Sequence, residues 1–552
     1  MNTTSRLALA AALGALAPVS SYAQQTTPRL ELQLNAAEQL GASGGVFVPF
    51  VTGDGTVVFA DGWLDYADSD DFSLSLGGGL RQQVGEWVLG GNAYFDFLHS
   101  DRGFTYGQLS AGLEALSDQW EFRVNGYAPT GDTSNEVDDL STFGISGGDF
   151  VFNQGYEVAL YGADAEVGMR LPVFEADSAS SWRVYAGAFT QGSDYTETVS
   201  GLTLRSEMTF ATDPQIIPGG TISLGGGMRY DSNQDLSAAA YIRFTAPIGG
   251  TPDAKEVTAP LFQRVERDRT IQTRSGALGD DELALGASGS SRVVQISAED
   301  GSAADLNRRI AAAGEGAIVL ASGEIELDNA ITMMKDQILI GGGGVVDLTT
   351  AGGRHIRYQN PGDRTTLRGG VAGAGASTIS LRAPLTPDVL VLADGNTVST
   401  LSIIGGNNAI VANKVSDINL EAIDISSASG NAVTLADVSG ATISALSING
   451  ATNAIVANGT RNLQIDKAAI SRVSGTGIAL NDVTGVSIST LSIDGGTNGI
   501  TANDVRNLAI NTALVESISG NGVTLGEVQG ATLSELSIQG GIDAIVAAKT
   551  DD

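Results

Sequence analysis

The amino-acid sequence predicts an all-β protein made of a membrane β-barrel followed by a parallel β-helix, and three observations support this prediction. In residues 45–248, apolar and polar residues alternate in short segments separated by Gly, Asp, Ser and Asn, as in strands buried on one face. From about residue 396 the sequence repeats every 45 residues, which is typical of a stacked solenoid. No segment after residue 23 has the roughly 18 consecutive apolar residues of a transmembrane helix, so a membrane-spanning form would be a barrel.

The composition excludes several kinds of functional site. The chain has 552 residues, no cysteine and only two histidines, His99 and His355. Disulfides, cysteine-based zinc sites and thiol nucleophiles are therefore excluded, and a histidine-based metal centre is not expected. The formal net charge is −33, which argues against nucleic acid as a partner because phosphates require a basic surface. We expect no cofactor.

The N-terminus predicts export. Arg6 precedes an apolar run from Leu7 to Val19, and Ser21-Tyr22-Ala23 has the small residues of a cleavage site. Residues 1–23 are therefore predicted to be a secretory signal peptide cut after Ala23. A buried N-terminal helix is the alternative, because short apolar runs also occur in protein cores. Residues 24–43 are then a short periplasmic N-terminal segment.

Residues 44–249 are predicted to form the barrel. In Phe72–Val84, a phenylalanine and leucines occupy one face, and serines, Arg81 and Gln83 occupy the other. Aromatic residues near strand ends, such as Trp87 and Phe97, and charges inside strands favour a membrane barrel with a polar lumen over a soluble β domain. An arginine facing lipid costs about 2–4 kcal/mol, so the charged side chains are expected to point inward. Those predicted to fill the lumen as structural ion pairs are Arg81, Asp96, Glu114, Arg123, Arg183, Arg205, Glu207, Arg229 and Arg243.

Motifs of this region, taken in order, resemble the inverse autotransporter β-domain of intimin and invasin. The resemblance covers about residues 44–275 and implies a twelve-stranded outer-membrane barrel with a periplasmic N-terminus. It also implies a linker that threads the pore to a C-terminal passenger, and assembly by periplasmic chaperones and the barrel-assembly machinery. Residues 24–43 are too short for a peptidoglycan-binding LysM module. The motifs are Phe72–Gln83, Leu89–Phe97, Leu109–Ala115, Asn125–Tyr127, Gly162–Pro172, Gly201–Glu207 and Leu261–Ile271.

Residues 250–291 are predicted to be the linker that threads the barrel. Pro252 and the glycines before it end the last strand, and a charged run extends from Gln263 to Arg274. Arg264, Arg267 and Arg269 would pair with an acidic lumen and hold the linker in the pore. A solvated charge run is the alternative.

Residues 292–552 are predicted to form a right-handed parallel β-helix that resembles the β-helix of pectate lyases. Each 45-residue unit holds two coils, of 23 and 22 residues. One coil has too little apolar area to fold alone, so coils must stack about 4.8 Å apart to build a continuous interior of Ile and Val. The coils lack the pattern of leucine-rich repeats. Copies of one motif begin at Thr397, Thr442, Ser487 and Thr532.

Two further features of the repeat region carry predictions. Asn recurs at one turn position, where it tolerates a left-handed φ and can hydrogen-bond up the stack as a ladder. Ala304–Ala313 has helical spacing and is predicted to cap the first coil. No such cap follows Ala547, so a partner or further chain is expected to cover the last coil. The predicted ladder is Asn408, Asn431, Asn453, Asn498 and Asn521.

The acidic residues of the repeats raise the question of an active site, because pectinolytic β-helices use carboxylate clusters with a basic residue. Asp437, Asp482 and Glu527 share one position on alternate coils. Alternate coils lie about 9–10 Å apart, slightly beyond the spacing of a catalytic carboxylate pair. We interpret these residues as solvated surface acids, and His355 with its neighbouring arginines as a loop contact.

Two functions of different classes follow. The first is an adhesin-like surface-display protein in the outer membrane, whose extracellular passenger binds an unknown glycan or protein. The second is a displayed polysaccharide-active enzyme, which would require a pocket with three carboxylates and an arginine within about 5 Å. A plain stalk is a third possibility. The first interpretation is preferred, with membrane lipid as a partner and with no catalytic, metal or cofactor residues.

Overall fold

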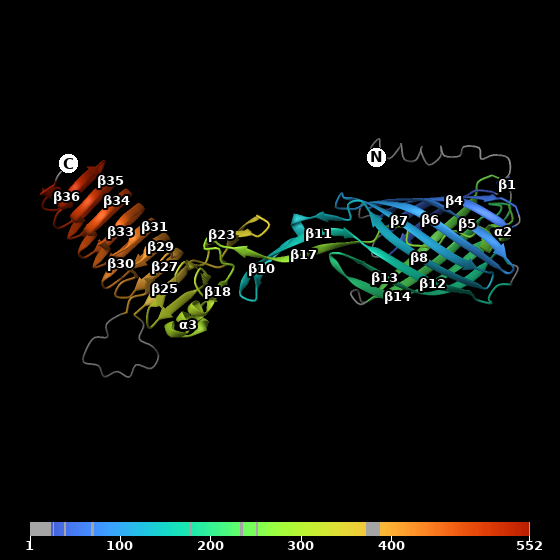
Figure 1. Cartoon of the computed structure of the whole chain (residues 1–552), viewed down its shortest axis with the longest axis horizontal. Helices are drawn as coiled ribbons and strands as arrows, with labels where there is room; N and C mark the ends of the chain where they lie inside the picture. The colour runs from blue at the N-terminus through green and yellow to red at the C-terminus, as the bar shows by residue number, and fades with distance from the viewer. Residues whose placement is uncertain are drawn as a thin grey trace. The chain divides into compact units, whose positions relative to one another are not determined.

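The computed structural model describes residues 24–25, 27–37, 40–53, 55–67, 71–175, 178–231, 236–249, 252–370 and 387–550. The predicted signal peptide, residues 1–23, lies outside the described residues. The chain divides into two compact units, residues 1–142 with 153–280 and residues 143–152 with 281–552 (Figure 1). Among the described residues, no helix has the length and hydropathy needed to cross a membrane.

The first unit is a closed barrel of twelve antiparallel strands, which confirms the predicted fold class. The ring closes where β16 pairs with β2, with Ala240 opposite Ala36 and Pro247 opposite Arg29. A short strand, β1 (Gln24–Gln25), pairs with β3 outside this ring. The twelve strands are β2 (Arg29–Ala36), β3 (Leu40–Val51), β4 (Thr56–Ala67), β5 (Phe72–Val84), β6 (Trp87–His99), β7 (Thr105–Leu116), β8 (Trp120–Thr130), β12 (Tyr161–Arg170), β13 (Ser181–Ser193), β14 (Thr196–Ala211), β15 (Thr221–Asp231) and β16 (Ser237–Pro247).

The barrel begins earlier than the sequence pattern indicated. Residues 24–43 were expected to be a separate periplasmic segment, but β2 and the start of β3 are part of the wall. Along β2 the leucines at positions 30, 32 and 34 are exposed, whereas Arg29, Glu31 and Gln33 are buried. This is the same alternation as in the rest of the barrel. The strand is only eight residues long, so its pattern is easily overlooked.

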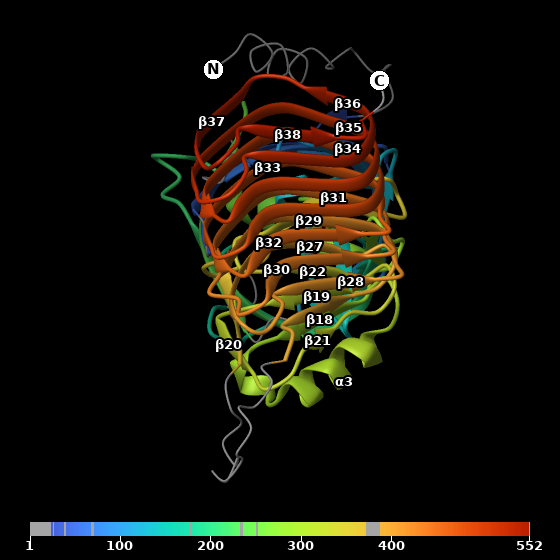
Figure 2. The same cartoon turned by 90° about the vertical axis from the view of Figure 1, so that its left-hand side faces the viewer.

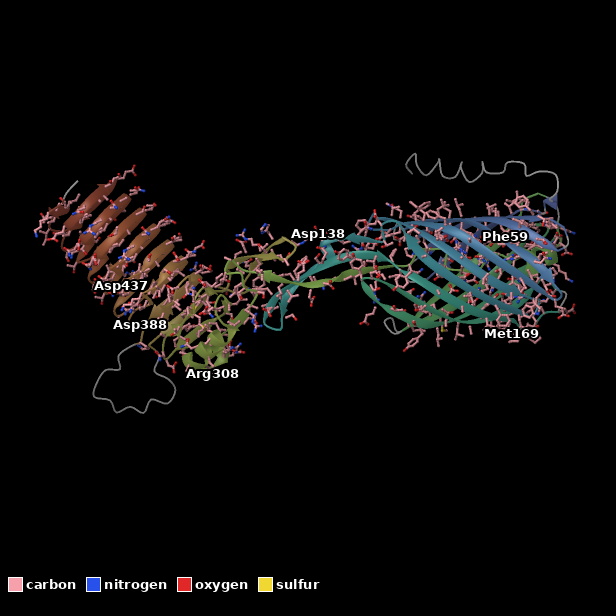
Figure 3. The ribbon with its side chains drawn as sticks, in the orientation of Figure 1. Phe59, Asp138, Met169, Arg308, Asp388 and Asp437 are labelled. Carbon is pink, nitrogen blue, oxygen red and sulfur yellow. The ribbon has the colours of Figure 1, made fainter. Side chains whose placement is uncertain are left out.

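The wall has an apolar outer face and a polar inner face. On β7, Leu109 and Leu113 are 54% and 71% exposed, whereas the adjacent residues Gln108, Ser110 and Glu114 are nearly inaccessible. Exposed leucines suit the hydrocarbon of a bilayer, and enclosed polar side chains suit a wet lumen. Figure 3 shows the side chains along the strands, with Phe59 of β4 and Met169 of β12 labelled.

Two stretches of chain between and after the barrel strands contain structure that the sequence pattern did not indicate. The connection from β8 to β12 holds β9 (Ser134–Glu136), the 3-10 helix η1 (Asp138–Leu140), β10 (Thr142–Ser146) and β11 (Asp149–Ala159). The segment expected to be a plain linker, residues 250–291, holds α2 (Ala254–Thr258), the 3-10 helix η2 (Pro260–Phe262) and β17 (Thr273–Leu285). Most residues of β9, η1, β10, α2, η2 and β17 are exposed or half-buried, so these elements lack the regular apolar face that a sequence pattern could reveal.

The second unit is a β-solenoid of about ten turns, in which every coil pairs in parallel with the next (Figure 2). A hairpin of β23 (Val345–Thr350) and β24 (His355–Gln359) lies outside this stack and pairs with the end of β17. The solenoid strands are β18 (Val293–Ile296), β19 (Ile318–Ala321), β20 (Glu324–Leu327), β21 (Ile331–Thr332), β22 (Ile338–Ile340), β25 (Thr365–Gly369), β26 (Leu390–Leu392), β27 (Thr397–Gly405), β28 (Ile410–Asn413), β29 (Ser416–Ser426), β30 (Asn431–Ala436), β31 (Ser439–Ala451), β32 (Asn453–Asn458), β33 (Arg461–Val473), β34 (Thr476–Gly496), β35 (Asn498–Ile518), β36 (Val523–Leu533), β37 (Leu536–Gly540) and β38 (Ile545–Ala548).

The interior of the solenoid consists of straight columns of aliphatic side chains. One column joins Ile403, Ile425, Ile448, Ile470 and Ile493, which are direct partners in successive coils and are at most 2% exposed. The 22- and 23-residue spacing therefore brings the same position of each coil into register. Each strand is paired on both edges except at the two ends of the stack.

A helix covers the first coil. Helix α3 (Ala303–Ala313) starts one residue before the predicted segment and buries Ala303, Leu306 and Ile310. Its N-terminus is a capping box, in which Ser302 and Asp305 each accept a hydrogen bond from the other residue's backbone N–H. Figure 2 shows α3 at the end of the stack where the first coils lie. Arg308, labelled in Figure 3, lies on the exposed side of α3.

The boundary of the second unit also differs from the prediction of residues 292–552. This unit begins at residue 281 and includes residues 143–152, which precede β12 of the barrel in sequence. Such a contribution from a distant segment leaves no periodic signal in the sequence.

Candidate functional site

The candidate site is the interior of the barrel together with the chain segment enclosed in it, residues 260–272. This segment hydrogen-bonds to inward-facing side chains of strands on several sides of the ring. Arg29 of β2 donates to the carbonyl of Phe262 at 2.5 Å. Asn125 of β8 donates to the carbonyl of Glu266 at 3.3 Å, and Tyr127 of the same strand accepts from the Asp268 N–H at 2.9 Å. The wall therefore holds the segment through its backbone as well as its side chains.

The strongest contact of the segment joins Arg267 to Asp96 of β6. The guanidinium nitrogens lie 2.7 and 2.9 Å from the two carboxylate oxygens, which is a bidentate ion pair. Ser75 and Ser110 donate to the same carboxylate at 2.5 and 3.1 Å. The Arg267 guanidinium also lies 3.8 Å from the centre of the Tyr94 ring. Asp96 is fully buried, so its charge is compensated by Arg267 and the two hydroxyls.

Arg81 of β5 connects the wall to the part of the segment that precedes Arg267 in sequence. It pairs with Glu114 of β7 at 2.7 Å. Its Nη1 also donates to the backbone carbonyls of Leu261 and Gln263. Arg81 is fully buried, and a guanidinium has five N–H donors to satisfy. One arginine therefore both neutralises a wall carboxylate and fixes the path of the enclosed chain.

A second charged cluster surrounds Glu266 of the segment. Arg264 forms a bidentate pair with it at 2.6 and 2.8 Å. Arg205 of β14 lies 3.7 Å from Glu266 and 2.7 Å from Glu166 of β12. A cavity of about 380 Å³ borders this cluster, so this part of the lumen is not completely filled.

The structure places the predicted lumen residues on the inner face of the wall. Arg123 and Arg183 both pair with Glu121, at 2.7 and 2.9 Å. Arg243 pairs with Glu207. Arg229 is different, because it stacks 3.6 Å over the Phe189 ring and donates to Gln191. Among the predicted linker arginines, Arg269 lies 3.3 Å from Asp65 and 4.0 Å from the Trp63 ring. Sequence reasoning did not single out Asp65, Glu166 or Glu266, although the inward positions of Asp65 and Glu166 in the alternation could have identified these two residues.

Apolar contacts complete the enclosure of the segment. Val265 packs with Phe47, Phe59 and Tyr94. Ile271 packs with Leu98 and Tyr106 and is 2% exposed. These positions lie on either side of the Arg267 contact, so the segment is fixed at three places along its path.

The Asn ladder of the solenoid is built from hydrogen bonds between successive coils. Asn408 Oδ1 accepts from the Asn431 N–H at 3.0 Å, and Asn431 Oδ1 accepts from Asn453 Nδ2 at 3.0 Å. Asn498 Oδ1 accepts from the Asn521 N–H at 3.0 Å. The expected left-handed φ is wrong, because none of these residues has a positive φ. The side-chain bonds, and not a left-handed backbone, account for Asn at this position.

Replacing Asn431 with alanine should lower the free energy of unfolding of the solenoid by about 1–2 kcal/mol, because it removes a half-buried acceptor and leaves the Asn453 amide without its partner. Thermal unfolding of the purified chain, followed by circular dichroism, measures the change. The matched control is Asn419→Ala on the outer face of β29, which should shift the midpoint little. Equal shifts for the two variants would contradict a stabilising role for the ladder.

Left-handed residues occupy a different column of the solenoid. Asp437, Asp482, Asp504 and Glu527 all have a φ near +50°. Asp504 lies on the coil between those of Asp482 and Glu527, and Gly459 lies on the coil between those of Asp437 and Asp482. This column therefore holds acidic residues on adjacent coils at Asp482, Asp504 and Glu527, in addition to the alternate-coil positions noted in the sequence. Asp437 is labelled in Figure 3.

The solenoid acids show no convergence on a single site within the described residues, in which no group of three or more His, Cys, Asp or Glu is arranged to hold a metal. Hydrogen bonds from Gln464 and Ser444 hold the pKa of Asp466 below its usual value. His355 begins strand β24 and contacts its cross-strand partner Thr349 of β23 at 3.2 Å, so the contact belongs to a β-hairpin and not to a loop.

The barrel with its enclosed segment defines an outer-membrane protein that holds part of its own chain in its lumen. Residues 16–187 match the family described as inverse autotransporter, beta-domain. This match supports an autotransporter barrel in the outer membrane, in agreement with the motifs in the sequence. No curated protein gives a significant match to the chain.

Three of the solved structures that match this chain have low sequence identity to it. One, described as "Unveiling the Mechanism Behind the in-meso Crystallization of Membrane Proteins", has 17% identity and a TM-score of 0.35, with 45% of this chain and 100% of the other covered. The COG4313 outer membrane channel from Pseudomonas putida F1 has 13% identity and a TM-score of 0.29, with 42% and 100% covered. The KdgM porin has 7% identity and a TM-score of 0.25, with 40% and 99% covered.

Proposed function

We propose that the protein anchors its own C-terminal solenoid in the outer membrane and displays it on the cell surface for adhesion. The observation that carries the proposal is the segment of residues 260–272 inside the barrel. This segment follows the last barrel strand in sequence and precedes the solenoid. A chain that enters the lumen from one side and continues beyond it connects the two sides of the membrane. The ion pair of Arg267 with Asp96 keeps the segment in that path.

The arrangement of charges supports a retained segment over a freely conducting pore. Asp96 and Arg81 are fully buried, and their partners or acceptors include Arg267 and the Gln263 carbonyl of the segment. If the segment were to leave, these charges would face an open lumen and would need water in place of fixed partners. The wall is therefore complementary to this particular segment.

The outer faces of the solenoid support a binding role for the displayed part. One outer column of direct partners reads Asn419, Thr442, Gln464 and Ser487 in successive coils. Such columns present hydroxyl and amide groups at the coil spacing of about 4.8 Å. A flat array of neutral hydrogen-bonding groups suits a hydroxyl-rich surface such as a glycan, and we propose a surface glycan or protein as the ligand.

Display is tested on intact cells that produce the full chain. An antibody raised against residues 387–550 should label these cells without permeabilisation, whereas a periplasmic marker should stay unlabelled. Cells that carry the protein should also adhere to glycan- or matrix-coated surfaces better than cells that lack it. Labelling only after lysis would contradict display. Normal labelling without any gain in adhesion would contradict the adhesive role alone.

A further inference from the structure

A short hairpin from the barrel half of the sequence is built into the second unit. We name residues 143–152, which form most of β10 and the start of β11, the donor hairpin. In sequence it lies between barrel strands β8 and β12, yet it folds with residues 281–552. Phe150 of the hairpin is fully buried. Its ring lies 5.5 Å from that of Phe143 and 5.1 Å from that of Tyr358 on β24.

The donor hairpin also pairs through its backbone with the start of the solenoid. The Phe150 N–H donates to the carbonyl of Ser291, and the Val293 N–H donates to the carbonyl of Gly148, both at 2.9 Å. Asp149 and Arg292 form an antiparallel bridge, and their side chains lie 3.1 Å apart. The hairpin therefore serves as an edge strand for the residues that lead into β18.

The outer face of the first coils explains why the hairpin is needed. One outer column begins with Val293, Ile318 and Ile338 and then continues with Thr397 and Asn419. The first three residues are buried with Phe150 in one apolar cluster. The column turns polar at Thr397, which lies outside this apolar cluster. The next column changes in the same way, from Leu320 and Ile340 to Ser399 and Glu421.

We propose that the donor hairpin is a template on which the exported chain folds. The proposal rests on the display function proposed above. Residues 143–152 lie between barrel strands β8 and β12 in sequence, so the hairpin remains tethered to the barrel through both of its ends once the barrel is closed. Residues 281–293 are the first part of the solenoid to follow the enclosed segment. They would find an edge strand and the Phe143–Phe150 surface ready to bind them.

The physical reason is the cost of starting a solenoid. Each coil must close a loop of 22 or 23 residues before its strands pair, and that loop-closure entropy is lost before contacts compensate for it. A preformed edge strand with an apolar surface supplies contacts to the first coil at once. Later coils then add to an existing stack, as in other repeat proteins. If the hairpin instead packed only on the finished solenoid, the first coil would have to close without these contacts.

The first experiment uses Phe150→Asp in the full chain. On intact cells, the protease-resistant solenoid at the surface should fall about tenfold or more, because a charge at a buried aromatic site removes the template surface. Ile145→Asp is the matched control, since Ile145 lies in β10 and is 39% exposed. Phe150→Leu should give an intermediate loss. Heat-modifiable migration of the barrel should be unchanged in all three variants. An unchanged amount of resistant solenoid in Phe150→Asp would overturn the proposal.

The second experiment measures the order of events. The chain has no cysteine, so Asp149→Cys with Arg292→Cys introduces the only two thiols, at bridge partners whose spacing suits a disulfide. In a pulse-chase on intact cells, the disulfide should form before residues 387–550 become protease-resistant. Disulfide formation after that resistance would overturn the template and leave display intact. Failure of display itself would appear separately, as wild-type solenoid that no antibody reaches on intact cells.

Discussion

Replacing Arg267 with alanine should loosen the segment inside the barrel and open the lumen. The substitution leaves the Asp96 carboxylate fully buried with the neutral donors Ser75, Ser110 and Gln108 but without its cationic partner. Removing one partner of a buried ion pair costs about 3–5 kcal/mol. The midpoint of heat-modifiable unfolding in detergent should therefore fall by roughly 10 °C. Single-channel recordings in planar bilayers should show a higher conductance than for the wild-type barrel.

Two variants separate the ion pair from a general effect of losing an arginine. Arg308→Ala removes the exposed pair with Asp305 on α3, which is worth at most about 1 kcal/mol, and should leave conductance unchanged. Arg267→Ala combined with Asp96→Ser removes both charges and should recover much of the lost stability, because no buried carboxylate is left without its partner. If the double variant were as unstable as the single one, the ion pair would not be the cause.

Ion pairs determine where the segment sits more than how tightly it is held. A buried pair is often no more stable than apolar groups of the same volume. Arg267, however, satisfies the Asp96 carboxylate only at one position along the lumen, and Arg81 reaches the Leu261 and Gln263 carbonyls only there. Shifting the chain by a few residues would break all of these contacts together. The lumen therefore selects one register of the enclosed segment.

The alternation of side chains was sufficient to predict the barrel and the orientation of its charges. Lipid and lumen demand opposite side chains at successive positions, so Leu113 and Glu114 of β7 reveal their environments directly. The same rule applies to β2, but its eight residues are too few to distinguish a strand from chance. The solenoid was predictable for a similar reason, since the 22- and 23-residue spacing brings Ile425 and Ile448 into one column.

Contacts between segments far apart in sequence could not be predicted. Nothing in the local pattern of residues 143–152 indicates that Phe150 packs against Tyr358, because the pairing depends on where the chain lies in space. The partner of Arg267 could be predicted as an acid of the lumen but not as Asp96 in particular. The repetition of Asn was sufficient to predict the ladder. The backbone conformation of these residues was predicted wrongly, because inter-coil hydrogen bonds of the side chain already account for Asn at this position without a left-handed φ.

Replacing Leu401 with aspartate should disrupt the solenoid around β27. Leu401 is fully buried and stands in one column with Thr365 before it and Ile423 after it. A carboxylate there would lose its hydration and find no cationic partner in the interior, and the leucine's apolar contacts would be lost as well. A cost of about 5 kcal/mol or more is expected. Because each coil contacts only its neighbours, the loss should be local at first.

The disruption can be located by limited proteolysis followed by mass spectrometry. New cuts should appear between residues 390 and 450, while the barrel keeps its heat-modifiable migration. Asn413→Asp introduces the same charge at an exposed position of the next strand, β28, and should produce no new cuts. If Leu401→Asp melted at the wild-type temperature, position 401 would not face the interior. The register of every coil that pairs in sequence with β27 would then be wrong, because a shift of one residue exchanges the inner and outer faces.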